Sequence, residues 1–422
     1  MDNETMAESW WIAFRSPVEI YENHANLLVA EVAMYAMAAL TVAHAWRKGG
    51  RYRSLWLAAL LHGLVTETVC YWVPEIDNFW HAQTSVMMLG RRLPLYIVFF
   101  HPVYSYVSNV AASRLKLGPF PTAYAAALAD CAAFHVFDII AIKLLWWTWH
   151  DTDPSIYERT FWVPFTSALY RLTFSTTFTL LFYGTHKVIT GKHMLQPGSS
   201  LQEAATVLLT GLLTFPTAIA THFIPLYHSL HDALGASSEV CVLAVIYLYI
   251  LIVWVSDRNG PQDGRPGRKD RNGPQDGRPR GTGSHPWKDE LTVVVLLHFL
   301  TFALLAVFAK PEAIVSTGIH EPLGPCNETV EFYNTIGQVV SKRKYLCPSD
   351  YDEGYMDFHC VPGGAAPPGV HHWYSVCGTP HENHAEHITV VWGFCLLGLT
   401  YYYNLLACSG LDESLAKKHK TN

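Results

Sequence analysis

This sequence is poor in charged residues and lacks the common nucleotide-binding motifs. Only 15% of its 422 residues are Asp, Glu, Lys or Arg. It has no Walker loop, no Gly-x-Ser-x-Gly elbow and no Gly-x-Gly-x-x-Gly after a strand pattern, so soluble nucleotide chemistry is not indicated. The loops that carry arginine are too short and unpatterned for nucleic-acid binding, and we expect no nucleic-acid partner.

No signal peptide is evident in this sequence either. The first residues are acidic (Asp2, Glu4 and Glu8), and the first apolar run begins only near Ala25, so the first helix must itself direct insertion. The three histidine boxes typical of membrane di-iron desaturases and hydroxylases are absent as well. We therefore do not expect that class of enzyme.

What the sequence does contain is a series of long apolar runs. Half of the residues are hydrophobic and 13% are aromatic, and an apolar run of about 20 residues is enough to cross the hydrocarbon core of a bilayer. We predict nine membrane helices, near residues 25–46, 54–73, 93–113, 121–149, 161–185, 203–224, 237–256, 290–309 and 388–407. The expected fold class is an all-α, polytopic transmembrane helix bundle.

Basic residues predict the orientation of these helices. Arg47, Lys48, Arg51 and Arg53 follow the first run, and the positive-inside rule places such a cluster in the cytosol. Alternation then puts three further basic segments on the cytosolic side, at 114–116, 187–192 and 258–288. The N-terminus is accordingly predicted to be lumenal and the C-terminus cytosolic.

The chain divides into five predicted segments. Residues 257–289 are rich in Gly, Pro and charge, and 257–266 is repeated at 270–279, which indicates a disordered cytosolic linker. The full division is a seven-helix membrane core with a lumen-facing polar cavity (1–256), the linker (257–289), a transmembrane helix (290–309), a lumenal cysteine-bearing loop (310–387), and a transmembrane helix with a basic cytosolic tail (388–422).

The cysteine-bearing loop indicates an oxidising compartment. It contains four cysteines, which suggest two disulfides whose pairing stays open among three possibilities: Cys326, Cys347, Cys360 and Cys377. Asn327 begins a glycosylation sequon. Lys418 and Lys420 near the C-terminus look like a dilysine retrieval signal, or are a basic tail that obeys the positive-inside rule. We expect the endoplasmic reticulum or another endomembrane, with the plasma membrane as the alternative.

Ionisable residues inside the apolar runs indicate a functional site. A charge at bilayer depth costs about 2.5–3.5 kcal/mol on insertion scales, so several of them usually line a cavity. Five are predicted to be catalytic, as acids, bases or a polar clamp: Glu67, His101, His135, Asp138 and Arg171. The alternative is that they are satisfied polar residues that hold the helices together.

Histidines near the lumenal ends suggest a metal site. His228-x-x-His231-Asp232 has metal-ligand spacing, and with His222 this set is the predicted metal site, although two histidines three apart are a weak signal without a third ligand. His381-x-x-His384-x-x-His387 is a second candidate, with a solvated polar face as the alternative. The sequence identifies no cofactor, and a divalent metal is the one it suggests.

Several aromatic segments carry a family resemblance. Glu67 to Pro74, Phe79-Trp80, Trp146-Trp147-Thr-Trp149-His-Asp-Thr-Asp-Pro154 and Trp162-Val-Pro164 resemble uncharacterised multi-pass membrane proteins. More distantly, residues 60–230 are similar to the carotenoid-biosynthesis integral membrane proteins, including the hydratases. That resemblance implies acid–base chemistry on a long isoprenoid or similar lipid, with Glu67 and Asp138 at the matching locations. The large cysteine-bearing loop and the two C-terminal helices depart from it.

The sequence is consistent with three functions. The first is a lipid- or isoprenoid-modifying enzyme that uses acid–base or metal-assisted chemistry on a membrane lipid or lipophilic small molecule. The second is a proton-coupled transporter or ion-conducting protein, favoured by Asp130, which lies toward the cytosolic side where a lumenal enzyme has no use for an acid. The third is a membrane scaffold or receptor. Substrate and oligomeric state stay open.

Overall fold

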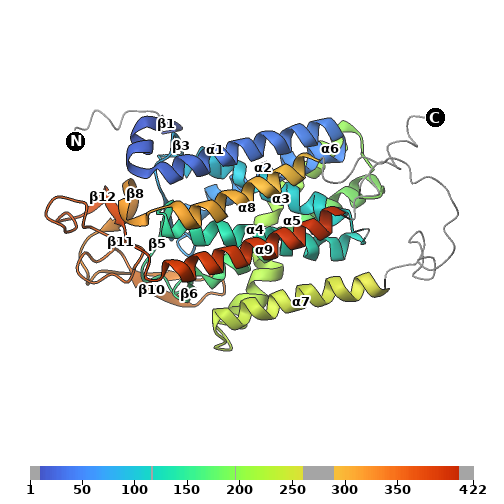
Figure 1. The fold of residues 1–422 in the computed structure, drawn as a ribbon. Helices are drawn as coiled ribbons and strands as arrows, with labels where there is room; N and C mark the ends of the chain where they lie inside the picture. The colour runs from blue at the N-terminus through green and yellow to red at the C-terminus, as the bar shows by residue number, and fades with distance from the viewer. Residues whose placement is uncertain (1–9, 116, 195, 260–288, 408–422) are drawn as a thin grey trace.

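Helices make up the body of the protein. The computed structural model describes residues 10–115, 117–194, 196–259 and 289–407. The repeat-bearing linker, apart from residues 257–259 and 289, and the basic tail from residue 408 onward lie outside the described residues. Within the described part there are nine α-helices, the number predicted, although only six of them qualify as membrane spans by length and hydropathy. They are α1 Pro17–Lys48, α2 Arg51–Cys70, α3 Leu95–Ser113, α4 Pro119–Lys143, α5 Phe165–Thr190, α6 Ser200–Ala218, α7 Ser238–Asn259, α8 Glu290–Phe308 and α9 His384–Ala407. They lie side by side as one bundle (Figure 1).

The chain is a membrane-embedded protein. Six of the described helices are long and apolar enough to cross a bilayer, namely α1, α4, α6 with its continuation, α7, α8 and α9. Exposed leucines, valines and aromatic residues cover the outer faces of α6, α7, α8 and α9, as expected for surfaces in contact with lipid. Helices α2, α3 and α5 carry more polar residues and lie toward the inside of the bundle; in α3, sixteen of nineteen residues are buried.

Helix α6 continues into a π-helix. Helix α6 begins with a capping box formed by Ser199 and Gln202. It contains Pro216 and runs directly into a π-helix, η2 Ile219–His228, which contains Pro225. Proline cannot donate a backbone hydrogen bond, and wide π turns are common at functional sites. The helix therefore widens here instead of ending.

The expectation of an all-α fold was wrong, because short sheets cover one end of the bundle. The strands are β1 Ile12–Phe14, β2 Phe79–His81, β3 Val86–Met88, β4 Leu93–Pro94, β5 Trp147–Trp149, β6 Arg159–Thr160, β7 Val163–Pro164, β8 Val315–Leu323, β9 Thr329–Tyr333, β10 Val339–Arg343, β11 Met356–Asp357 and β12 His371–Gly378. They form the antiparallel sheets β1-β3-β4, β2-β5, β6-β7, β9-β10 and β11-β12-β8. Apolar runs predicted as single helices end in these strands: the run 121–149 is helical only to Lys143 and then becomes β5.

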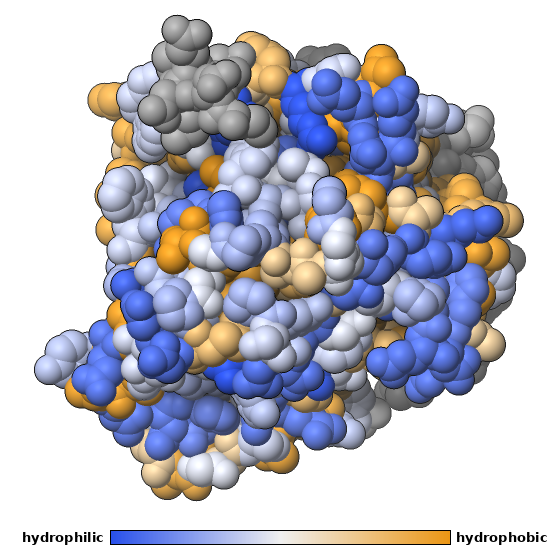
Figure 2. Space-filling view, turned by 90° about the vertical axis from the view of Figure 1, so that its left-hand side faces the viewer, coloured by the Kyte–Doolittle hydropathy of each residue, from blue (hydrophilic) through white to orange (hydrophobic). Residues whose placement is uncertain are grey.

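Residues 311–383, here called the cap, lie over this end of the bundle. Two disulfides hold the cap, Cys326–Cys347 and Cys360–Cys377. The prediction of two disulfides in this segment is therefore confirmed, and the fold selects one of the three pairings. The cap end presents a largely hydrophilic surface on which apolar groups are scattered (Figure 2). The cap docks on the strands and loops that join the helices, through ion pairs such as Lys342–Asp153 and Arg159–Glu353.

Candidate functional site

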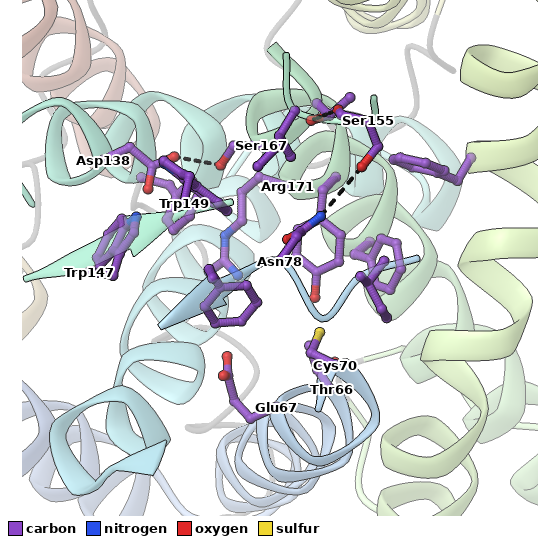
Figure 3. A pocket seen from close by; sticks show the side chains of 18 of the residues that line it. Thr66, Glu67, Cys70, Asn78, Asp138, Trp147, Trp149, Ser155, Ser167 and Arg171 are labelled. Carbon is purple, nitrogen blue, oxygen red and sulfur yellow. Dashed lines mark hydrogen bonds between the residues drawn. The ribbon is translucent and has the colours of Figure 1, made fainter. Parts of the chain in front are cut away.

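A cavity of about 180 Å³ lies among α2, α3, α4, α5 and η2, beneath the cap. Aromatic residues make up much of its wall, including Phe100, Phe134, Phe137, Trp147, Trp149 and Phe174. Charged and imidazole side chains of the helices also face it: Glu67, His101, Asp138 and Arg171. In Figure 3, Arg171 lies between the two carboxylates.

Glu67 of α2 is bonded to His101 of α3. Glu67 Oε1 and His101 Nε2 are 2.8 Å apart, both residues are buried, and Glu67 Oε2 has no hydrogen-bond partner. Arg171 Nη1 lies 3.5 Å from His101 Nδ1. Because arginine can only donate, Nδ1 is the acceptor and Nε2 carries the proton that His101 donates to Glu67. The free Glu67 oxygen is left available to the cavity.

Arg171 of α5 is held from the opposite side by Asp130 of α4. Its Nη2 lies 3.0 Å from Asp130 Oδ1, and its guanidinium sits 5.0 Å from the ring centroids of both Phe100 and Phe134. A buried ion pair with stacking on two rings suits arginine better than lysine, because the planar guanidinium can do both at once. Four helices are thereby linked by one chain of polar contacts.

Asp138 of α4 forms the second acidic group. Its Oδ2 accepts a hydrogen bond from Ser167 Oγ at 2.5 Å, the residue is 1% exposed, and Oδ1 has no hydrogen-bond partner. Two carboxylates on different walls of one cavity, each with a free oxygen, are the arrangement in which one carboxyl can donate a proton while the other accepts one.

The two arms of the site have a similar local design. Helices α3 and α5 each follow a short antiparallel pairing that ends in proline, β3-β4 before α3 and β6-β7 before α5. His101 and Arg171 each lie seven residues after that proline, Pro94 or Pro164. The preceding strands β2 and β5 pair with each other. The site is thus built from two α-β-α units of similar local design, which the equal proline spacing could have suggested from the sequence.

Polar residues from the loops and the cap form the roof of the cavity. Asn78, Ser155, Glu75 and Thr335 line it, with Asn78 Nδ2 donating to Ser155 Oγ at 3.4 Å and Thr335 bonded to Glu75. Sequence reasoning missed Thr335, because a threonine in a polar loop more than 250 residues from Glu67 carries no local signal.

His81 of β2 also lines the cavity and was not among the predicted site residues. It is 6% exposed, and neither ring nitrogen has a hydrogen-bond partner. Burial lowers the pKa of His81 to about 4, an effect that the charge of Glu67 only partly opposes. A neutral imidazole therefore faces the cavity close to the predicted acids.

The remaining predicted residues are only partly brought together. His135 does not line the cavity, and its ring packs 4.7 Å from that of Phe394. Among the predicted metal ligands, His228 and His231 each contact Asp232, at 2.7 and 2.6 Å, while His222 contacts Thr177 and Thr221 instead. In the described part of the chain, three groups of residues bring three possible metal-ligand atoms close together, and none of these groups contains any of the four predicted ligands. His228 does line the cavity.

The fold and the cavity define a class of protein: a multi-pass helical membrane protein with a buried, mainly aromatic cavity that holds acidic, basic and imidazole side chains. The chain belongs to the family of the domain of unknown function DUF7802, whose sequence model matches residues 3–407. This agrees with the expected membership of an uncharacterised family. No curated protein matches the chain, and no solved structure does. The similarity to carotenoid-biosynthesis proteins accordingly gains no support from these comparisons.

Proposed function

We propose that this protein is a membrane-embedded enzyme that binds a lipophilic substrate in the cavity and acts on it by acid–base chemistry. The observation that carries the proposal is the pair Glu67 and Asp138, whose free oxygens share one apolar cavity. Ionisable groups in a membrane interior are expensive to bury, and a buried pair in a cavity is the usual sign of a working site.

The walls favour an apolar substrate. Most lining residues are aromatic or aliphatic, and 180 Å³ is room for the reacting part of a lipid and not for a whole chain. On the η2 side the wall consists of Phe215, Ile219 and Phe223, which are only half-buried. Neighbouring residues such as Leu212 are 51% exposed on the outer face of α6. This wall is the natural route by which the rest of a lipid chain would reach the bilayer.

Two carboxyl groups support a reaction in which the substrate receives one proton from the enzyme and the enzyme takes one proton back in each turnover. In reversible hydration of a C=C bond, the protonated carboxyl donates its proton to one carbon, and the carboxylate accepts a proton from the water that attacks the other carbon. In double-bond migration the second carboxylate removes a proton from the substrate instead. An unsaturated isoprenoid or similar lipid is a suitable substrate class.

A proton-coupled transporter is the second candidate. The observation in its favour is that polar contacts continue from the cavity toward the far ends of α3, α4 and α5. Asp130 pairs with Arg171 outside the cavity lining, and Thr179 Oγ1 donates to Asn109 Oδ1 at 2.8 Å. Such a series could pass protons between the two sides of a membrane.

The enzyme proposal is tested by deuterium exchange. Purified protein is reconstituted with total lipid extract from its native membrane in D₂O, and lipids are analysed by mass spectrometry. An acid–base enzyme introduces deuterium at carbon, and Glu67→Gln or Asp138→Asn should lower the rate by at least about 100-fold. Glu31→Gln is the matched control, because Glu31 is equally buried but bonds to Tyr35 and Ser85 away from the cavity.

The outcomes separate the candidate functions. No carbon-bound deuterium with any lipid in the extract would contradict the enzyme. Proton flux into liposomes that depends on Asp130 would instead favour the transporter. Loss of folded protein in the Glu67 and Asp138 variants, but not in the Glu31 variant, would favour a structural role and a scaffold.

We also propose that the cap lies in a lumenal or extracellular compartment, with the endoplasmic reticulum as the first expectation. Disulfides persist in oxidising compartments, and the basic residues Arg47, Arg53 and Lys187 lie at the helix ends opposite the cap. Asn327 is exposed in the cap. A glycosidase-sensitive mobility shift that Asn327→Gln abolishes would support this orientation, and labelling of the cap from the cytosol would contradict it.

A further inference from the structure

A second group of ionisable residues lies outside the membrane helices, where the cap meets the core. His150 and Asp151 directly follow β5, and Glu321 is near the end of β8 in the cap. All three are buried, with exposed fractions of 2–3%. One ligand atom from each lies within 4.8 Å of the others. The chain thus brings an imidazole and two carboxylates from distant segments to one point.

Three of the four carboxylate oxygens at this point lack hydrogen bonds, and the fourth, Glu321 Oε2, accepts the backbone N–H of Asp151 at 3.3 Å. Both Asp151 side-chain oxygens and Glu321 Oε1 are buried without a hydrogen-bond partner. His150 Nε2 is 3.1 Å from Glu321 Oε1, and His150 Nδ1 is 3.6 Å from Asp151 Oδ1. Although the first distance is short, it is not aligned as an N–H···O bond. A buried carboxylate oxygen without a hydrogen bond is unfavourable, and a donor or a positive charge nearby is needed to compensate it.

Nearby cations supply only part of that compensation. Each has a closer carboxylate of its own, in the ion pairs Arg159–Glu353 at 2.6 Å, Lys342–Asp153 at 2.8 Å and Arg343–Asp350 at 2.6 Å. Arg343 reaches Asp151 only at 3.6 Å. Asp151 thus shares one arginine with Asp350, and among the described residues Glu321 forms no ion pair with a lysine or arginine, so the two carboxylates beside the imidazole are only partly compensated.

The His150 ring is directed toward the carboxylates, with Nε2 3.1 Å from Glu321 Oε1. The backbone N–H of Thr152 donates to His150 Nδ1 at 3.2 Å, so Nε2 is the nitrogen that would bind a metal in place of its proton. A divalent cation there would offset the two buried carboxylates.

We propose that His150, Asp151 and Glu321 form a binding site for a divalent transition metal, with Zn²⁺ as the expected ion. Zinc takes imidazole and carboxylate ligands at about 2.0–2.2 Å, and three protein ligands with one water are common. Tetrahedral ligands at that radius are about 3.3–3.6 Å apart, close to the separations in this group. A Ca²⁺ site would need about six to eight oxygens.

The position of the site indicates its role. Glu321 belongs to the cap, while His150 and Asp151 belong to the core loop between β5 and α5. Trp149 at the end of β5 and Ser155 in the following loop line the cavity. The backbone N–H of His150 donates to the carbonyl of Asn78, which also lines it. A bound ion would therefore fasten the cap to the core beside the roof of the cavity.

The test is metal analysis of the full-length protein, purified without a histidine tag. After dialysis against zinc and then against zinc-free buffer, we expect about one zinc per chain, and added zinc should raise the melting temperature of the chelator-treated protein. His150→Gln and Glu321→Gln should each weaken zinc binding at least about 100-fold. His320→Gln should not, because His320 is an equally buried neighbour on β8 that bonds to the Ser316 carbonyl.

Two results would overturn the proposal. If the His150 ring simply donates its Nε2 proton to Glu321, the wild-type protein retains no zinc and its melting temperature is unchanged by the ion. If zinc binds but survives in His150→Gln, it belongs to another cluster such as His381 and His384. Should the variants fail to fold, X-ray absorption of the zinc-loaded wild type decides: one imidazole with oxygen ligands is expected, and sulfur or several imidazoles would refute the site.

Discussion

Gly63 sets the distance between α2 and α3 at the candidate site. A Cβ atom at this position would lie 2.6 Å from His101 Cβ and 2.7 Å from His101 Cγ, whereas ordinary contacts begin at 3.4 Å. The obstructing atoms are at the base of the histidine, so rotation of the ring cannot remove the clash. In Gly63→Ala the two helices must separate by at least 0.8 Å at this point, and His101 moves away from Glu67.

The expected cost combines opposing effects. Overpacking a close contact costs about 1–3 kcal/mol, and weakening the 2.8 Å His101–Glu67 hydrogen bond removes about 0.5–1.5 kcal/mol. Alanine recovers about 1 kcal/mol through its better helix propensity. We expect a net loss of about 1–3 kcal/mol in unfolding free energy, and about a 100-fold fall in deuterium exchange, because shifts near 1 Å in a catalytic group have effects of that size.

The assay is thermal unfolding in detergent together with the exchange measurement. Gly184→Ala is the matched control, because Gly184 lies in α5 and a Cβ atom added there would have no atom within 4 Å. That control should be as stable as the wild type or slightly more so. If Gly63→Ala is as stable and as active as Gly184→Ala, the close approach of the two helices does not position His101, and the reasoning about the site fails.

The double variant Cys360→Ser, Cys377→Ser should lose about 3 kcal/mol in denaturant unfolding, because the bond closes a 17-residue loop; an unchanged midpoint would speak against a stabilising disulfide. Arg171→Gln should cost about 3–5 kcal/mol by leaving Asp130 buried and unpaired, and adding Asp130→Asn should recover part of it, whereas strictly additive losses would refute the coupling. Burial lowers the pKa of His320 to about 4, so between pH 6.5 and 4 the unfolded chain binds more protons than the folded one and stability falls as the pH drops. Over that pH range the unfolding free energy of His320→Gln should fall by about 3 kcal/mol less than that of the wild type. Identical pH profiles for the two proteins would show that His320 does not titrate in this way.

The candidate site was partly visible in the sequence because ionisable residues stand out in apolar runs. Glu67, Asp138, His101 and Arg171 all meet at or beside one cavity. His135 was grouped with Asp138 by its helical spacing, yet its ring packs against α9. Spacing along one helix shows which residues share a face, but the neighbouring helix decides what that face meets.

The apolar runs and their lengths determined the helices, since a span must be long and apolar to replace water with lipid. Other features depended on tertiary contacts. Short strands such as β2 and β5 form only because Phe79 to His81 find a partner at Trp147 to Trp149, and isolated pairs of that length are not stable alone. The cap, the roof residue Thr335 and the group at Glu321 reach the core from far along the chain. Local sequence pattern carries no record of such contacts, and only the folded packing brings them together.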